Sequence, residues 1–295
     1  ERGVDGEVVP LIAPSLEPAA RVSGNPHRLV ANAGLSFQGS NILGLGFTME
    51  PERARELIAK SPRNADVLFP YLNGQDLNTD PGCAASRWVI NFHDWPEDKA
   101  RQYPECYDQV RRLVKPERER NKDKNRRELW WRFTRPAPEL YAAIAGLERV
   151  VVITLVSKTV MPAMVPTGQV FSHGLGVFAT DDPAMLALLS SAPHYWWAVA
   201  RASSMKADLR YTPSDVFETF PLPDLSQEMR ELGDRLDTYR RDVMLSRQTG
   251  LTKTYNLVFD PSVHDEDIVE LRRVHQAIDE ATVRAYGWDD LLAQL

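Results

Sequence analysis

The alternation of apolar and polar residues changes character along the chain. Over the first 223 residues the apolar runs are short and turn residues separate them, which predicts short strands mixed with short helices. The clearest strand is expected at 149–156, where the continuous β-branched run of Val150 to Ile153 is typical of a buried strand. Further short strands follow at close spacing and are expected to form an antiparallel set, at 161–165, 169–171 and 175–179.

Beyond residue 223 apolar residues recur at alternating steps of three and four, the spacing of one face of a helix. One amphipathic helix is expected along Met229, Leu232, Leu236, Tyr239 and Val243, and a second along Ile268, Leu271, His275 and Ile278. Residues 250–263 are interpreted as the loop between them. The pattern therefore predicts an α+β (mixed α/β) domain with short strands over residues 1–223, followed by a C-terminal α-helical hairpin over 224–295.

The charge is distributed unevenly. The formal net charge is −6, and residues 224–295 account for all of it, with nine basic and 15 acidic side chains. Residues 1–223 are neutral overall, but the stretch 101–135 holds 12 basic and six acidic groups, a local +6. A DNA-contact surface is therefore allowed in the middle of the chain, although the protein as a whole is not basic.

Several classes of protein are disfavoured. No apolar run approaches the roughly 18 residues of a membrane span, and the first residues have neither the basic start nor the apolar segment of a signal peptide. Cys83 and Cys106 form no disulfide framework or metal signature, which favours a reduced, cytoplasmic setting. The chain does not begin with Met, so we expect a fragment or a trimmed chain.

The first candidate for chemistry is the stretch around Lys206, Asp208 and Arg210. In an extended strand, residues at alternate positions point to one face, so these three would project together. A cation, an anion and a guanidinium fork are side chains that read base edges in the major groove. The alternative is a surface edge strand whose charges only keep it soluble, and the pattern alone does not separate the two.

The second candidate is the basic segment from Lys115 to Arg127 and the aromatic residues that follow it. Basic residues beside tryptophans suit phosphate contacts together with stacking or groove insertion. The residues expected to contact DNA in this way are Lys115, Arg118, Arg126, Arg127, Trp130, Trp131 and Arg132. The alternative is a solvated charged helix whose tryptophans fill the core.

Two smaller patterns receive structural interpretations. Gly44-Leu45-Gly46 lacks the Lys-Ser/Thr end of a phosphate loop and the third glycine of a dinucleotide fingerprint, so it is interpreted as a close-packing or bulge glycine pair. His93, near Asn91 and Asp94, has no second His or Cys at ligand spacing and is interpreted as a structural hydrogen-bonding residue.

Several motifs, taken in order, resemble one known family. Residues 209–223 read LRYTPSDVFETFPLP, which looks like the end of the target recognition domain in MmeI-like (type IIG/IIL) bifunctional restriction enzymes and adenine-specific DNA methyltransferases. The other motifs similar to the family are 36–40 with 44–47, 70–77, 87–92, 114–118, Trp130-Trp131 and 250–256. Each is weak singly, but they run over nearly the whole chain in the expected order.

The resemblance implies sequence-specific recognition of double-stranded DNA as part of a site-specific adenine-N6 methyltransferase and restriction enzyme. Lys206, Asp208 and Arg210 match the position of the family's specificity residues. The family's Asp/Asn-Pro-Pro-Tyr/Phe/Trp motif and its S-adenosylmethionine loop are absent. We therefore expect no catalytic residues, metal or cofactor in this chain, with S-adenosylmethionine and Mg²⁺ used by preceding methyltransferase and nuclease domains.

Two alternatives remain from other classes. One is a protein-interaction scaffold whose acidic helical segment docks a partner without intrinsic DNA specificity. The other is an independent Mg²⁺ nuclease built from Glu97-Asp98-Lys99 with Asp76 or Asp80, since carboxylates with a lysine can hold the metal and activate water. The acid-x-Lys pattern is common by chance, and this second alternative is the weaker one.

Overall fold

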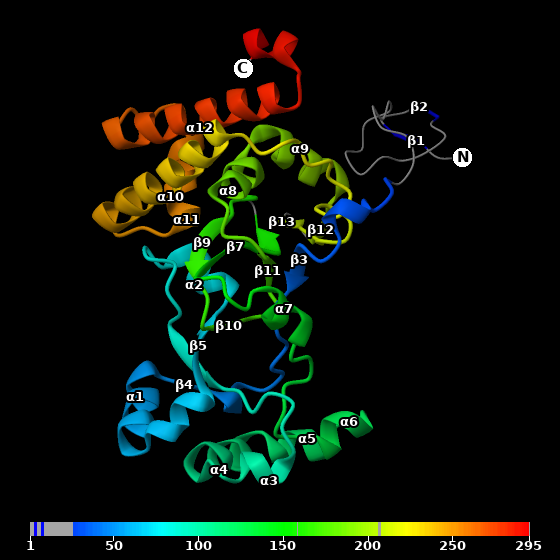
Figure 1. The fold of residues 1–295 in the computed structure, drawn as a ribbon, viewed down its shortest axis with the longest axis vertical. Coiled ribbons are helices and arrows are strands. Elements are labelled where there is room, and N and C mark those ends of the chain that lie inside the picture. The colour runs from blue at the N-terminus through cyan, green and yellow to red at the C-terminus, as the bar shows by residue number, and fades with distance from the viewer. Residues whose placement is uncertain (1–2, 5–6, 9–25, 158, 206–207, 295) are drawn as a thin grey trace.

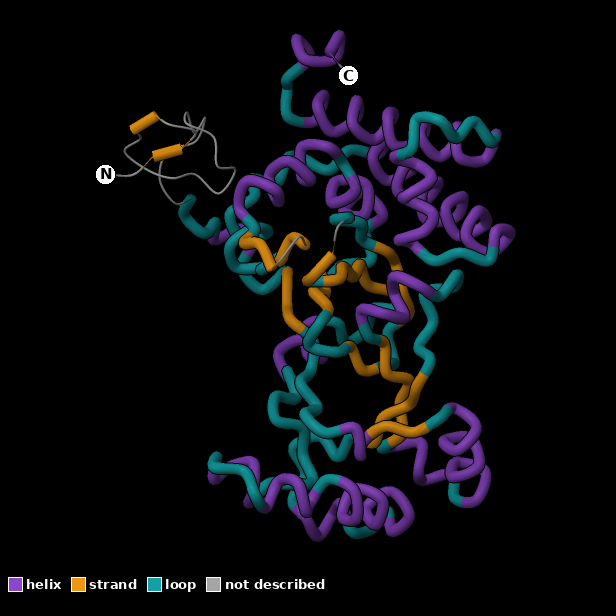
Figure 2. Tube along the Cα trace, turned by 180° about the vertical axis from the view of Figure 1, so that it is seen from behind, coloured by secondary structure: helices purple, strands orange, loops and turns teal. Residues whose placement is uncertain are grey.

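The computed structural model describes residues 3–4, 7–8, 26–157, 159–205 and 208–294. Helices occupy both ends of an elongated molecule and most strands lie between them, as the view from behind also shows (Figures 1 and 2). The longer helices are α1 (Pro51–Lys60), α4 (Pro104–Leu113), α8 (Pro183–Ser190), α9 (Ala192–Arg201), α10 (Gln227–Arg247), α11 (Leu251–Phe259) and α12 (Glu266–Ala285). The short ones are α2 (Gly74–Thr79), α3 (Glu97–Ala100), α5 (Lys115–Glu119), α6 (Lys124–Glu128) and α7 (Pro138–Ala143).

The described strands form small sheets. The central antiparallel sheet has the order β3-β11-β7-β9, from β3 (Ser36–Gln38), β11 (Leu175–Phe178), β7 (Arg149–Thr154) and β9 (Ala163–Pro166). A second has the order β10-β5-β6-β4, from β10 (Val170–Phe171), β5 (Leu68–Leu72), β6 (Arg87–Ile90) and β4 (Thr48–Met49). A third joins β12 (Ser203–Met205), β13 (Asp208–Arg210) and β8 (Val156–Ser157), and the fourth joins β1 (Gly3–Val4) to β2 (Glu7–Val8).

The buried strand expected from the β-branched run is β7, whose residues from Val150 to Thr154 are all buried between β11 and β9. The single antiparallel set expected for 161–179 is wrong in one strand. β10 leaves the sheet that β9 and β11 share and pairs in parallel with β5, with Val170 opposite Tyr71. Periodicity gives the strands but not their partners, because pairing is decided by segments about a hundred residues apart in sequence.

The buried apolar side chains of the described residues form two separate hydrophobic cores. One lies around β4, β5, β6, α1 and α4 and includes Phe47, Val89 and Val110. The other combines the central sheet with α8 and the C-terminal helices, and it reaches from Leu72 to Ala281. The boundary expected at residue 223 stays a prediction, to which the structure adds that this second core continues across it.

The C-terminal helices pack on α8, of which residues 184–190 are all buried. The apolar faces expected from the steps of three and four belong to α10 and α12, and Met229, Leu236, Ile268 and Leu271 are fully buried on them. The loop expected between them is wrong in part, since 251–259 form α11. Among the described helices, none combines the length and apolarity needed to cross a membrane.

The helical part of the chain that begins at Pro104 is broken near Pro116, since proline cannot continue a helix from its interior. α4 ends at Leu113, Pro116 lies in the first turn of α5, and Asp123 then caps α6 by accepting hydrogen bonds from two backbone N–H groups. The mixed α/β architecture with C-terminal helices, expected from the sequence, is the observed fold.

Candidate nucleic-acid interface

The segment around residue 208 is a strand hairpin, which corrects the single extended strand expected there. β12 and β13 pair antiparallel, with Met205 opposite Asp208. Asp208 and Arg210 still occupy alternate positions of one strand, β13, and Arg210 is exposed. Lys206 lies outside the described residues.

An exposed polar strip continues from Arg210 across neighbouring strands. Arg210 pairs with Val156 of β8, and Leu155, next in the chain, donates its backbone N–H to the Gly174 carbonyl at 2.9 Å. The exposed His173 precedes Gly174 in the same turn, so backbone hydrogen bonds through β8 and Leu155 connect the strand of Arg210 to the turn that carries His173. Gln38 of β3 donates to the His173 carbonyl at 2.7 Å.

Arg135 is the last member of this strip. Its guanidinium donates to Gln38 Oε1 and, at 3.4 Å, to the Gly39 carbonyl. Its backbone exchanges two hydrogen bonds with Asn41, which fixes the segment beside β3. We call Arg210, His173, Gln38 and Arg135 the polar strip; it brings two exposed cations, an imidazole and an amide onto one set of adjacent backbone segments.

A buried pair anchors the strip behind Arg210. Tyr211 donates its backbone N–H to the Leu155 carbonyl at 2.8 Å, and its hydroxyl lies 3.0 Å from His194 Nε2. His194 Nδ1 lies 2.8 Å from the Leu189 carbonyl, so Nδ1 carries the proton and Nε2 accepts from Tyr211. His194 is fully buried, and this burial lowers its pKa to about 4.

This histidine makes stability depend on pH. An unfolded histidine has a pKa of about 6.5, so the unfolded chain binds this proton more readily than the folded chain, and the free energy of unfolding decreases as the pH falls from about 6.5 toward 4. His194 alone should remove about 2 kcal/mol by pH 5. Urea unfolding at pH 7 and pH 5 measures this, with His194→Gln expected to reduce the dependence; the part that remains includes His275, whose pKa burial lowers to about 3. If the free energy of unfolding of His194→Gln changed with pH as much as that of the unchanged chain, the assignment would be contradicted. His264→Gln is the control, because His264 is exposed.

The aromatic part of the basic segment belongs to the core. Trp130 and Trp131 are only 4% and 6% exposed, and Trp131 Nε1 donates to the Trp95 carbonyl at 2.9 Å. The expected stacking of these rings on bases is therefore corrected: as the alternative interpretation held, they fill the core. An aromatic pair after a basic run looks the same in sequence whether it faces DNA or the interior.

Arg118 is likewise internal. It is 3% exposed, and its guanidinium donates to the carbonyls of Arg132 at 2.8 Å, Ile42 at 2.7 Å and Leu43 at 3.0 Å. Burial lowers its pKa to about 10. The structure thus gives this side chain a scaffolding role in place of the expected phosphate contact.

The other expected cations lie at or near the surface. Lys115 is half-buried, 3.8 Å from Glu119 and above the Trp130 ring; Arg126 is half-buried and pairs with Asp123 at 3.5 Å. Arg127 is exposed and donates to the carbonyls of Asn121 and Lys122, whereas Arg132 is half-buried and donates to the Trp95 carbonyl at 3.0 Å. Further exposed cations on the same helices and loops are Arg111, Arg112, Arg120, Lys122 and Lys124. Their contact with phosphates stays a prediction.

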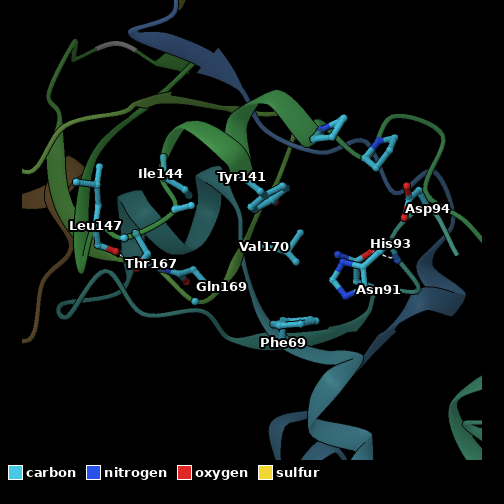
Figure 3. Close-up of a pocket in the computed structure, with 15 residues that line it drawn as sticks. Phe69, Asn91, His93, Asp94, Tyr141, Ile144, Leu147, Thr167, Gln169 and Val170 are labelled. Atoms are coloured by element: carbon cyan, nitrogen blue, oxygen red, sulfur yellow. Dashed lines mark hydrogen bonds between the residues drawn. The ribbon is translucent and has the colours of Figure 1, made fainter.

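A pocket of about 530 Å³ lies between α7, β5 and β10 (Figure 3). Tyr141 and Phe69 lie on opposite sides of Val170 in it, and Asn91, His93 and Asp94 form its polar end. His93 Nε2 lies 3.3 Å from the Asp66 carbonyl, which agrees with a structural hydrogen-bonding role.

No metal centre accompanies this pocket. Within the part of the chain that the structure describes, no group of three or more His, Cys, Asp or Glu side chains is placed to hold a metal ion. Glu97 instead accepts hydrogen bonds from Tyr107 and Arg101, and Asp76 accepts from the Asn73 side chain and from the backbone N–H of Ser86. Two carboxylates of the nuclease alternative, Glu97 and Asp76, are thus taken up by hydrogen bonds within the protein.

Sequence reasoning missed His173 and did not assign Gln38 a contact. Gln38 stands in a family-like motif and Arg135 at the end of the basic segment, but nothing near His173 in the sequence marks it. Its place beside Arg210 follows from hydrogen bonds between segments far apart in the chain.

The chain folds as a mixed α/β domain with a C-terminal set of helices. Residues 35–224 match the family described as "MmeI, target recognition domain", and because the match covers more than half of the chain, the chain belongs to this family. A solved structure of the type IIL restriction-modification enzyme MmeI in complex with DNA is similar in fold, with a TM-score of 0.69 and 16% identity over 95% of this chain and 36% of that one.

A curated relative is similar over a shorter stretch. DNA methyltransferase A of Bacillus subtilis (strain 168) is 27% identical over 117 residues, which are 40% of this chain and 12% of that protein. The chain thus spans about a third of the MmeI structure and about an eighth of the methyltransferase.

Proposed function

We propose that the chain recognises a short, asymmetric site in double-stranded DNA, as the C-terminal part of a site-specific adenine-N6 methyltransferase and restriction enzyme. The observation that carries the proposal is the polar strip on a fold of the MmeI target recognition family. The similar solved structure was determined in complex with DNA, and the curated relative is a DNA methyltransferase, which supports the wider assignment. Methyl transfer and cleavage belong, in this proposal, to other domains.

Base readout is assigned to Lys206, Asp208 and Arg210, with His173 beside them. An arginine can donate two hydrogen bonds to O6 and N7 of guanine, an aspartate accepts from the cytosine amino group or orients the arginine, and a lysine donates to an acceptor-rich edge. Exposed cations of α4 to α6 would contact phosphates, which sets register and affinity without reading sequence.

The direct test is selection of bound duplexes from a random pool by the full chain at low salt, followed by sequencing. An enriched asymmetric motif of several base pairs is the expected result. Salt-sensitive binding without enrichment would mean that the chain by itself binds DNA but does not recognise a particular sequence. The absence of any binding would favour the scaffold alternative.

Two substitutions should separate base readout from phosphate contact. Arg210→Ala should change the preference at one base pair by ~1–3 kcal/mol and leave the others intact. Arg120→Ala, on the exposed basic segment, should weaken all sequences alike and reduce the salt slope by about 1. Titrations on single-base variants of the selected site, at several salt concentrations, measure both. An equal loss on every sequence for Arg210→Ala would make Arg210 a phosphate contact.

A further inference from the structure

Three leucines near the basic segment are exposed, although the loop that carries two of them is firmly held. Leu45 is 76% and Leu113 56% exposed, and Leu43 lies beside them at the surface. Large apolar side chains gathered at a protein surface usually mark a contact site. We call these three residues the leucine tip.

Buried polar side chains fix the loop from below. Arg118 donates to the carbonyls of Ile42 and Leu43, and Gln109 Nε2 donates to those of Gly46 and Thr48, both at 3.1 Å. These contacts hold the backbone in one conformation, so Leu45 cannot turn inward without breaking them.

The glycine pair makes this arrangement possible. A Cβ on Gly46 would lie 2.6 Å from Leu113 Cβ, so the loop and α4 touch only because residue 46 has no side chain. Leu43 has a φ of +40°, a region that costs a non-glycine residue energy and is kept where the surroundings impose it. The close packing expected for the glycine pair is observed at Gly46, and its consequence is to present Leu45 outward.

The leucine tip is close to the polar strip. The strip ends at Arg135, whose backbone is hydrogen-bonded to Asn41 at 2.8 and 3.1 Å. Asn41 is four residues from Leu45, and four residues span at most roughly 14 Å. That distance corresponds to about four base-pair steps of a duplex.

Charged side chains of both signs lie around the leucine tip. Arg111 and Arg112 adjoin Leu113 and share one carboxylate, Asp108, at 2.8 and 3.2 Å. Glu117 lines the shallow hollow beside Leu45 and is the acidic group nearest the tip in that hollow. The stretch 101–135, which carries Leu113, holds 12 basic and six acidic groups; Arg118 is buried, but Arg111, Arg112, Arg120, Lys122 and Lys124 are exposed, and this excess of cations suits the phosphates of a nucleic acid better than a neutral or basic protein surface.

We propose that Leu45, supported by Leu113, is an apolar wedge that enters the groove of bound duplex DNA and partly unstacks a base step a few pairs beyond the Arg135 end of the polar strip. Leucines inserted in this way, flanked by cations, kink duplexes in other DNA-binding proteins. The proposal rests on the proposed function, because it needs the duplex to lie along the strip.

The test uses the full chain and the duplex obtained by selection, with 2-aminopurine placed at successive positions. Binding should raise the fluorescence at one step, since unstacking relieves its quenching, and Leu45→Ala should abolish the rise and weaken binding by about tenfold. A mismatch at that step should restore most of the affinity of Leu45→Ala, because the step is then already unstacked. The salt slope should stay unchanged.

Leu245→Ala is the matched control, because Leu245 is an exposed leucine on α10, in the acidic C-terminal segment. It should leave both affinity and fluorescence unchanged. If Leu45→Ala binds as tightly as the unchanged chain while Arg210→Ala still alters base preference, the wedge is refuted and the proposed function stands. If the unchanged chain shows no salt-dependent DNA binding, both are refuted.

Discussion

Replacing Arg118 by methionine is expected to lower the free energy of unfolding by roughly 4 kcal/mol, even though the position reads in sequence as a surface cation. The change removes the donors for three carbonyls, those of Ile42, Leu43 and Arg132. Each buried acceptor left without a donor costs about 1–3 kcal/mol, and methionine regains part of the total because no charge then has to be buried. Urea unfolding and the melting temperature measure the loss.

Arg120→Met is the control, because Arg120 is exposed two residues further along the same basic segment. It should change stability by no more than about 0.5 kcal/mol. Below its melting temperature, Arg118→Met should show the same salt slope of DNA binding as the unchanged chain. An unaltered stability with a salt slope reduced by about 1 would instead make Arg118 the phosphate contact that its sequence context suggested.

Replacing Gly233 by valine should destabilise the protein by about 4 kcal/mol, because it separates α10 from α8. A Cβ at residue 233 would lie 1.9 Å from the Pro183 carbonyl oxygen and 2.6 Å from its carbon, both backbone atoms that cannot rotate away. Overpacking against backbone forces whole elements apart, at the upper end of the usual cost. The N-terminus of α8 should feel the change first, since Arg230 of α10 also donates to its capping residue, Asp182.

Thr238→Val on the same helix supplies the comparison. Thr238 is exposed, and valine there has nearly the shape of threonine, so the effect should stay within about 0.5 kcal/mol. Calorimetry on both variants also tests how residues 224–295 relate to the rest. For Gly233→Val we expect a lower melting temperature of the whole core that the central sheet shares with α8 and the C-terminal helices. If the C-terminal helices alone melted earlier and the remainder melted unchanged, the two parts would fold independently.

His275 and His194 show which structural roles can be inferred from local sequence patterns and which cannot. His275 lies on the apolar face of α12, and its place at a helix interface could be inferred from spacing; its Nε2 is 2.7 Å from the Tyr255 hydroxyl. His194 gave no such signal, yet it holds Tyr211 and, through it, the end of β13. The buried face of a helix follows from the spacing of apolar residues within that helix. A buried polar pair instead depends on where two segments distant in sequence come into contact.

The basic segment shows the same limit for a functional site. The stretch from Lys115 to Arg132 is uniformly rich in basic residues, but its side chains differ in burial. Arg118 and the two tryptophans are buried, whereas Arg127 is exposed. Pro116 lies in the first turn of α5 and Asp123 caps α6, so the segment forms two short helices in place of one continuous amphipathic face. Composition predicts a basic surface, but not which of its cations form that surface.

The sequence by itself determined the mixed α/β class, the C-terminal helices with their buried faces and the family, because these depend on periodicity and on motifs whose order can be read along one chain. Only the tertiary structure decided the parallel partner of β10, the burial of Arg118, and the meeting of His173, Gln38 and Arg135 beside Arg210. These features arise from backbone hydrogen bonds and close contacts between segments that are distant in sequence. Their energies depend on the packing of the whole molecule, so no local pattern records them.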